Sequence, residues 1–166
     1  MTPHLWVVAF VALQRIAELA WSRRNTRRLL GEGGVEVGAG HYPLIVALHA
    51  AWFVALVVAV PRDAPIHLPF LGVYGLLLAL RLWVMASLGR YWTTRVITVP
   101  GAPLVKRGPY RFMRHPNYAV VMGEVAVVPL IFGAWEIALL FSILNLILLR
   151  HRIAVEDAAL DERRSA

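Results

Sequence analysis

A basic segment in the second half of the chain carries the densest group of side chains that could bind a ligand. Residues 106–118 read KRGPYRFMRHPNY. Its arginines can hold a carboxylate or a phosphate, and His115 can exchange a proton near neutral pH. Arginines alone would fit a solvated loop that touches lipid phosphates. The ordered elements Gly-Pro-Tyr and Arg-His-Pro-Asn-Tyr exceed what lipid contact requires, so this segment is the first candidate for a binding site.

A second candidate lies near the C-terminus, where Arg152 and Glu156 are four residues apart and share one face of a predicted helix. A surface ion pair of this kind contributes little to stability. The acidic pair Glu156-Asp157, which follows an apolar stretch, could bind a hydroxyl or a cationic group.

Four charged residues lie well inside apolar stretches, where a charge is costly and normally faces a partner or a cavity. Arg15 and Glu18 are three apart on one helix face. They are either a self-neutralising pair, with Arg15 reaching to the interface, or the polar wall of a substrate pocket. We interpret Arg81 as a side chain that reaches back to the interface. Glu124, on the same face as Asn117, is a functional candidate because of its depth.

The N-terminal half adds Asn25, Glu36, His41 and Tyr42 around a glycine-rich turn that lacks the context of a dinucleotide fingerprint. Each of these alone is typical of residues at a membrane interface. His49 lies two turns after Tyr42 on the same face, which favours a functional role modestly.

Composition indicates the class of protein that positions these residues. The chain has 166 residues, of which 59% are hydrophobic and 16% charged, against about 45–50% and 25% in soluble domains. So small a core cannot bury that many apolar side chains, so lipid must solvate many of them. The absence of cysteine excludes disulfides, thiolate nucleophiles and thiolate metal sites, and we expect no metal.

Five apolar segments are candidate transmembrane helices: 5–21, 43–60, 68–88, 118–132 and 135–149. The last two form a hairpin, with Pro129 bending its first arm. Of the 17 basic residues, fourteen flank one side of these segments and only Arg62 the other. The positive-inside rule then places the N-terminus outside and the C-terminus in the cytosol. We expect the chain to lie in the cell (inner) membrane. The predicted fold is all-α and polytopic, with anionic lipid rather than nucleic acid as the partner of the basic residues.

The two C-terminal elements resemble the isoprenylcysteine carboxyl methyltransferase family of membrane enzymes. The matching residues are Gly108-Pro109-Tyr110, Arg114-His115-Pro116-Asn117-Tyr118, Arg152-Ile153 and Glu156-Asp157. The N-terminal half looks like a bacterial branch, whose members O-methylate alkylpyrones or alkylresorcinols and are linked with type III polyketide synthases. The resemblance implies a methyltransferase that uses S-adenosyl-L-methionine and a lipophilic acceptor, with a polyketide synthase as a pathway partner.

The resemblance also implies roles for individual residues in one membrane-embedded domain, with 1–88 on the substrate side and 89–166 on the cofactor side. The expected cofactor contacts are Lys106, Gly108, Tyr110, Arg114, His115, Pro116, Tyr118 and Glu156. The expected catalytic residues are His41, His49, Glu124 and Arg152, and the expected substrate contacts are Arg15, Glu18, Asn25, Glu36 and Tyr42. Family members commonly continue past the acidic pair, so we expect an incomplete cofactor lid or one built from residues 31–40.

Two other functions remain open at this stage. Sterol-reductase-like enzymes share a similar Arg-His-Pro-Asn-Tyr element, which would indicate an NADPH-dependent membrane reductase, although such proteins are usually longer. A small transporter could use Arg15, Glu18 and Glu124 as a polar track, but no inverted repeat supports it.

Overall fold

The computed structural model describes residues 2–165, with side chains described through Asp161. Its α-helices are α1 (Pro3–Gly31), α2 (Tyr42–Val58), α3 (Leu68–Leu88), α4 (Pro116–Leu130) and α5 (Trp135–Ser165). Short 3₁₀ turns are η1 (Ala39–His41), η2 (Gly89–Tyr91) and η3 (Gly108–Arg111), and the strands are β1 (Val35–Glu36) and β2 (Ile97–Thr98). The predicted all-α, polytopic architecture is confirmed.

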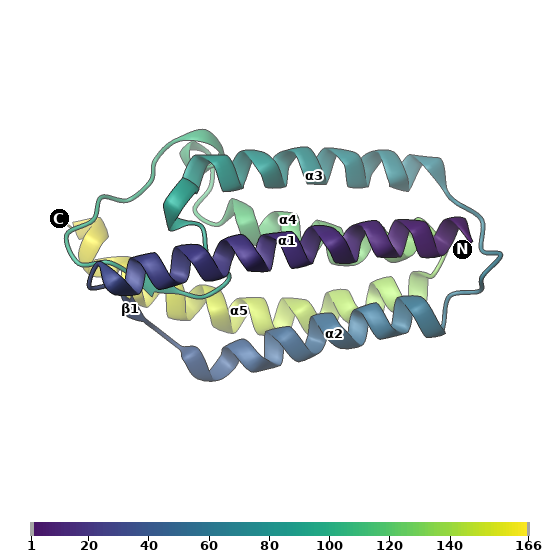
Figure 1. Ribbon diagram of the computed structural model, residues 1–166, viewed down its shortest axis with the longest axis horizontal. Coiled ribbons are helices and arrows are strands. Elements are labelled where there is room, and N and C mark those ends of the chain that lie inside the picture. The colour runs from purple at the N-terminus through teal and green to yellow at the C-terminus, as the bar shows by residue number, and fades with distance from the viewer. Residues whose placement is uncertain (1, 166) are drawn as a thin grey trace.

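The helices run alternately up and down one bundle, so the two chain ends lie at opposite ends of it (Figure 1). Four helical segments of the described chain are long and apolar enough to cross a membrane, and α4 is a shorter apolar helix. The fifteen residues of α4 span about 22 Å, less than a hydrocarbon core of about 30 Å. The chain is therefore a multi-pass membrane protein whose fourth helix is short.

Apolar side chains occupy both the interior and the outside of the bundle. Val11, Leu56, Val128 and Ile131 are fully buried in a core shared by several helices. Many equally apolar side chains face outward along the helices, among them Leu13, Val58, Leu76, Leu139 and Ile147. Such a surface would be unstable in water, and it fits a protein solvated by lipid.

The helix ends differ from the predicted segments in two places. The predicted first segment, 5–21, continues through its arginines as one helix to Gly31, because no glycine or proline interrupts it and arginine favours helix. The predicted fifth segment, 135–149, likewise continues into the C-terminal helix without a break. Two of the basic residues counted after it lie in 162–166, where the side chains are outside the described part of the chain.

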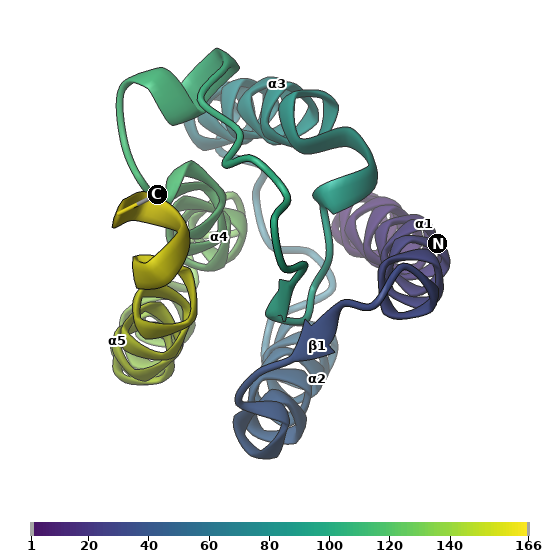
Figure 2. The same ribbon diagram turned by 90° about the vertical axis from the view of Figure 1, so that its left-hand side faces the viewer.

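The glycine-rich turn after α1 makes a contact that was not predicted. β1 pairs antiparallel with β2, with Val35 opposite Thr98 and Glu36 opposite Ile97. The amide of Val37 also donates to the carbonyl oxygen of Val96 at 2.9 Å. This short ladder fastens residues 31–38 to the long segment between α3 and α4, at the end of the bundle shown facing the viewer in Figure 2.

Candidate active site

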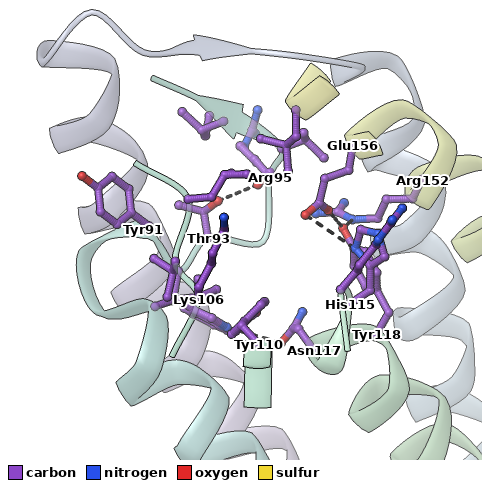
Figure 3. Close-up of a pocket in the computed structure, with 18 of the residues that line it drawn as sticks. Tyr91, Thr93, Arg95, Lys106, Tyr110, His115, Asn117, Tyr118, Arg152 and Glu156 are labelled. Atoms are coloured by element: carbon purple, nitrogen blue, oxygen red, sulfur yellow. Dashed lines mark hydrogen bonds and ion pairs between the residues drawn. The ribbon is translucent and has the colours of Figure 1, made fainter. Parts of the chain in front are cut away.

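A cavity of about 410 Å³ lies at the end of the bundle where α4 begins and α5 extends beyond it (Figure 3). Its lining comes from the segment between α3 and α4, the first turn of α4 and the C-terminal half of α5, all between Leu88 and Leu160. Pockets for small molecules measure roughly 300–1,000 Å³. The cavity thus has the volume of a small-molecule pocket and lies among the segments that were predicted to hold a cofactor.

Tyr118, Arg152 and Glu156 form a connected group on one side of this cavity. The hydroxyl of Tyr118 donates a very short hydrogen bond to Glu156 and accepts one from Nε of Arg152 at 2.8 Å. Arg152 is buried and also donates through Nη2 to the carbonyl oxygen of Thr94 at 2.7 Å. One guanidinium therefore joins α4, α5 and the segment that follows α3.

His115 precedes α4 directly and lies against the same group. Its ring stacks on that of Tyr118, with centroids 5.5 Å apart, and its Nε2 lies 3.0 Å from a carboxylate oxygen of Asp157. Pro116 occupies the first helical position, where its missing N–H costs no hydrogen bond. These contacts hold the start of α4 to the C-terminal half of α5, and they explain why the Arg-His-Pro-Asn-Tyr element needs its order.

The opposite wall of the cavity is held by α1. Asn25 donates to the carbonyl oxygens of Trp92 at 2.8 Å and Gly89 at 3.2 Å. The Trp92 side chain is buried, and its Nε1 lies 3.4 Å from Oδ1 of Asn117. Asn25, which was predicted to contact substrate, thus contacts the backbone of the wall.

Two further predicted substrate contacts, Glu36 and Tyr42, also reach this wall. Nη1 of Arg95, which lines the cavity, lies 2.7 and 2.8 Å from the two carboxylate oxygens of Glu36. The Arg95 guanidinium lies 4.6 Å above the ring of Tyr42. The hydroxyl of Tyr42 lies 3.1 Å from the hydroxyl of Thr94. The backbone amide of Thr94 donates to the hydroxyl oxygen of Ser22 in α1 at 2.8 Å.

The η3 turn closes the cavity beside the end of α3. Gly108 has a positive φ of 58°, and an added Cβ would lie 2.0 Å from Oγ of Ser87. Nε of Arg107 donates to the carbonyl oxygen of Ser87 at 2.8 Å. Burial, and secondarily the carboxylate of Glu156, raises the pKa of the Tyr110 hydroxyl. Tyr110 therefore stays protonated and offers the cavity a hydrogen-bond donor, while Gly108 allows the turn to approach α3.

Four charged residues form a separate group deeper in the bundle, which we call the ion quartet: Arg15, Glu18, Arg81 and Glu124. Arg81 bonds to both carboxylate oxygens of Glu18, at 2.5 and 2.6 Å, and to Glu124 at 2.8 Å. Arg15 lies 2.7 Å from Glu18 and 2.6 Å from Glu124.

The ion quartet corrects two interpretations made from the sequence. Arg81 does not reach back to the interface, because it is buried and bonded to two carboxylates. Arg15 also turns inward, and its pair with Glu18 is only half of the group. Two arginines and two glutamates cancel one another's charge, as buried ions must. None of the four lines the cavity.

The two histidines expected to be catalytic also lie outside the cavity lining. His49 bonds through Nδ1 to the carbonyl oxygen of Ile45 at 2.8 Å. His41 is buried, with its ring 5.3 Å from that of His151. Of the four predicted catalytic residues, Arg152 is the one that reaches the cavity, and the roles of all four stay predictions.

Sequence reasoning did not single out Ser22, Trp92, Thr94 or Arg95. The segment 92–95, WTTR, is aromatic, polar and basic within a long connection, which is a usable signal. Ser22 follows Glu18 by four residues and precedes Asn25 by three, so these polar side chains share one helix face.

Comparison with known proteins agrees with the geometry. A model of the isoprenylcysteine carboxyl methyltransferase (ICMT) family matches residues 70–162, more than half of the chain, and this range includes the whole cavity lining. The chain belongs to this family. Membership of the ICMT family indicates a membrane methyltransferase, and favours that activity over a reductase or a transporter.

Two relatives extend the match to the N-terminal helices. The chain is 41% identical over 161 residues to the uncharacterized protein YpbQ of Bacillus subtilis, covering 94% of this chain and 95% of that one. It is 23% identical over 154 residues to an uncharacterized protein of Haemophilus influenzae, with 88% of each chain covered. No solved structure matches. The similarity to these relatives therefore extends beyond the ICMT region into the N-terminal helices.

Enzymes of the ICMT family use S-adenosylmethionine, and the cavity's side chains suit its chemical groups. Glu156 can accept from a ribose hydroxyl or an amine, and Lys106 and Arg114 can pair with a carboxylate. The rings of Tyr110 and Tyr118 offer π faces to an adenine or to a positively charged sulfur. The donor set therefore fits this cofactor.

Proposed function

We propose that this protein is an S-adenosylmethionine-dependent O-methyltransferase that acts on a lipophilic acceptor. The observation that carries the proposal is the joined group of Tyr118, Arg152 and Glu156 in a cavity at one end of an apolar bundle. A carboxylate held beside an aromatic ring suits a cationic, hydroxyl-bearing ligand. The apolar bundle suits an acceptor that is dissolved in the bilayer.

In this proposal Glu156, Tyr118 and His115 hold the cofactor from one side. Lys106, Tyr110 and Arg114, on the segment before α4, hold it from the other. Gly108 lets the η3 turn approach α3, and Pro116 sets where α4 begins. When bound, S-adenosylmethionine supplies an electrophilic methyl group. Arg152 acts by fastening the Thr94 segment to Tyr118, so that the two walls keep a fixed separation. Positioning of this kind supplies a large part of the acceleration in a bimolecular reaction.

The acceptor's oxygen decides whether a base is needed. A carboxylate or an acidic enol is already ionised, and basic side chains nearby keep it so. A less acidic phenol needs a proton acceptor. Of the three histidines that could serve, His115 is the one that lines the cavity, whereas His41 and His49 lie outside its lining.

We further propose that the cavity faces the cytosol of the cell (inner) membrane, with the N-terminus outside. Fourteen of the 17 basic residues flank that end of the predicted spans. The cofactor then enters from the cytosol and the acceptor sideways from the bilayer. The acceptor is an isoprenylcysteine-like carboxylate or a long-chain polyketide pyrone or resorcinol, the latter with a polyketide synthase as pathway partner.

Calorimetry on the purified protein in lipid nanodiscs tests cofactor use. We expect S-adenosylmethionine to bind and NADPH to give no heat. Glu156→Gln and His115→Ala should abolish the binding, while Glu136→Gln and His67→Ala, in exposed positions at the opposite end of the bundle, should leave it unchanged. Binding of NADPH alone, or unchanged affinity in Glu156→Gln, would contradict the proposal.

Mass spectrometry of co-purifying lipids tests the acceptor. Incubation with cofactor that carries a labelled methyl group should add that label to one class of lipid. A long-chain pyrone or resorcinol would support the polyketide branch, and a prenylated thioether would support the isoprenylcysteine type. Label on nitrogen or carbon would rule out O-methylation while leaving methyl transfer intact.

A further inference from the structure

Two large apolar side chains project outward from the end of the η3 turn. Phe112 is 78% exposed and Met113 is 49% exposed. They lie in the polar connection between α3 and α4, outside the lipid-facing surfaces of the long helices. Single exposed apolar residues are common in proteins, so the position and the neighbours of this pair decide its meaning.

The η3 turn lies against the end of α3, at the outer edge of the bundle (Figure 2). An added Cβ at Gly108 would lie 2.0 Å from Oγ of Ser87 and 3.1 Å from the indole nitrogen of Trp83. Trp83 is 47% exposed on α3, one turn before Ser87. Partly exposed tryptophan near the end of a span is typical of the level where hydrocarbon meets lipid headgroups. The turn is therefore held at the depth of that boundary.

The charges of the turn complement an anionic surface. Segment 106–114 contains one lysine and three arginines and no acidic residue. Arg107 is committed to the end of α3 through Ser87, and Arg114 lines the cavity. The guanidinium of Arg111 is exposed and makes no hydrogen bond or ion pair with any residue whose side chain is described. A cation left available directly beside exposed Phe112 and Met113 is the arrangement found in interfacial membrane anchors.

We infer that the η3 turn docks on the anionic headgroup layer of the membrane, with Phe112 and Met113 entering the apolar layer and Arg111 pairing with lipid phosphate. Residues on the other side of the same short segment, Tyr110 and Arg114, line the cavity. The bilayer surface thereby holds one wall of the cavity in place. This inference concerns the surface and does not depend on which cofactor or acceptor the cavity binds.

The chain has no cysteine, so a single introduced cysteine can carry an environment-sensitive fluorophore without other changes. Phe112→Cys reports the turn. Ile147→Cys, on the outward face of α5, is the lipid-exposed reference, and Ala158→Cys, on an exposed position near the end of α5, is the water-exposed reference. Each labelled full-length protein is placed in nanodiscs of phosphatidylcholine, with and without phosphatidylglycerol.

In nanodiscs that contain phosphatidylglycerol, we expect the Phe112→Cys label to emit to the blue of the Ala158→Cys label and to be quenched by bromine on lipid chains. Adding Arg111→Gln should lower the inserted fraction in the anionic discs, by about fivefold in the inserted-to-withdrawn ratio for one cation. The same substitution should have little effect in pure phosphatidylcholine. An emission equal to that of the Ala158→Cys label in both lipids would overturn the inference. Insertion that is unchanged by Arg111→Gln and by phosphatidylglycerol would overturn the inferred pairing of Arg111 with anionic lipid.

Discussion

The cavity and the ion quartet contain the same types of charged residue in two different roles. In the ion quartet each arginine meets both glutamates, and no described part of the group borders the cavity. In the cavity, Arg152 and Glu156 do not pair directly but share the hydroxyl of Tyr118, beside a space of about 410 Å³. The charges of the ion quartet pair with one another inside the bundle, although Oε1 of Glu124 is buried without a hydrogen-bond partner. Arg152 and Glu156 instead border an open space.

One helix face connects the two regions. Glu18, Ser22 and Asn25 are buried at spacings of four and three along α1, so the first belongs to the ion quartet and the other two hold the cavity wall. Any shift of α1 along its axis would disturb both. The ion quartet therefore contributes to the cavity by fixing the position of α1, without touching a ligand.

The largest effect should come from breaking the ion quartet. Arg81→Met leaves Glu18 and Glu124 buried with one cation between them, and removal of one partner from a buried ion group costs about 3–5 kcal/mol. We expect a large fall in the thermal stability of the protein in detergent. Static light scattering during heating measures that fall.

The matched control for that change is charge-neutral. Arg81→Met combined with Glu124→Leu leaves Arg15 and Glu18 as a balanced pair, and should regain more than half of the lost stability. If the single variant is as stable as the unmodified protein, the ion quartet does not hold the bundle together.

The cavity should respond in ligand affinity more than in stability. Tyr118→Phe removes the hydroxyl that Arg152 and Glu156 share, which leaves a buried donor without its acceptor at a cost of about 1–3 kcal/mol. If that cost falls on the cofactor complex, cofactor affinity measured by calorimetry should fall by about fivefold or more, on the scale of about 1.4 kcal/mol per tenfold.

For comparison, Tyr42→Phe removes a hydroxyl whose one hydrogen bond within the described part of the chain is to Thr94, behind the wall. It should weaken cofactor binding much less than Tyr118→Phe. Equal losses in the two variants would mean that the wall, and not the shared hydroxyl, controls affinity.

A smaller effect is expected at Gly108. Gly108→Ala introduces a side chain at positive φ, which costs about 1–2 kcal/mol, and a clash with Ser87. The turn should move away from α3 and weaken cofactor binding, as seen by titration. Adding Ser87→Gly removes the clash with Ser87 but neither the backbone strain nor the close contact with Trp83, so it should restore part of the affinity. No restoration would show that the clash with Ser87 is not responsible.

The smallest effect should come from the ion pair of Glu36 and Arg95. The Arg95 side chain is 39% exposed, and exposed pairs contribute about 0.2–1 kcal/mol. Glu36→Gln should therefore change thermal stability little. A loss as large as that of Arg81→Met would erase the distinction between the mutually paired buried charges and the charges at the cavity's edge.

Much of this protein was predictable because lipid imposes a simple rule on sequence. Long apolar segments in a membrane must become helices whose backbone groups bond internally. The helices, the hairpin of α4 and α5 and the membrane class of the protein therefore followed from hydropathy. The ordered elements from Gly108 to Tyr118 and from Arg152 to Asp157 indicated a binding site because their residue order exceeded what packing requires. Their positions at the start of α4 and along α5 then brought them together.

Other features depended on which helix faces meet, which helical spacing alone does not specify. Arg81 and Glu124 are 43 residues apart, and nothing local distinguishes an arginine that reaches the interface from one that turns inward to two carboxylates. Asn25 and Glu36 similarly contact Trp92 and Arg95 of the cavity wall, which lie 67 and 59 residues further along the chain. Their substrate contacts stay predictions. Sequence determined that the charges within the spans needed partners, because hydrocarbon does not solvate ions. Tertiary structure alone decided which partners they received.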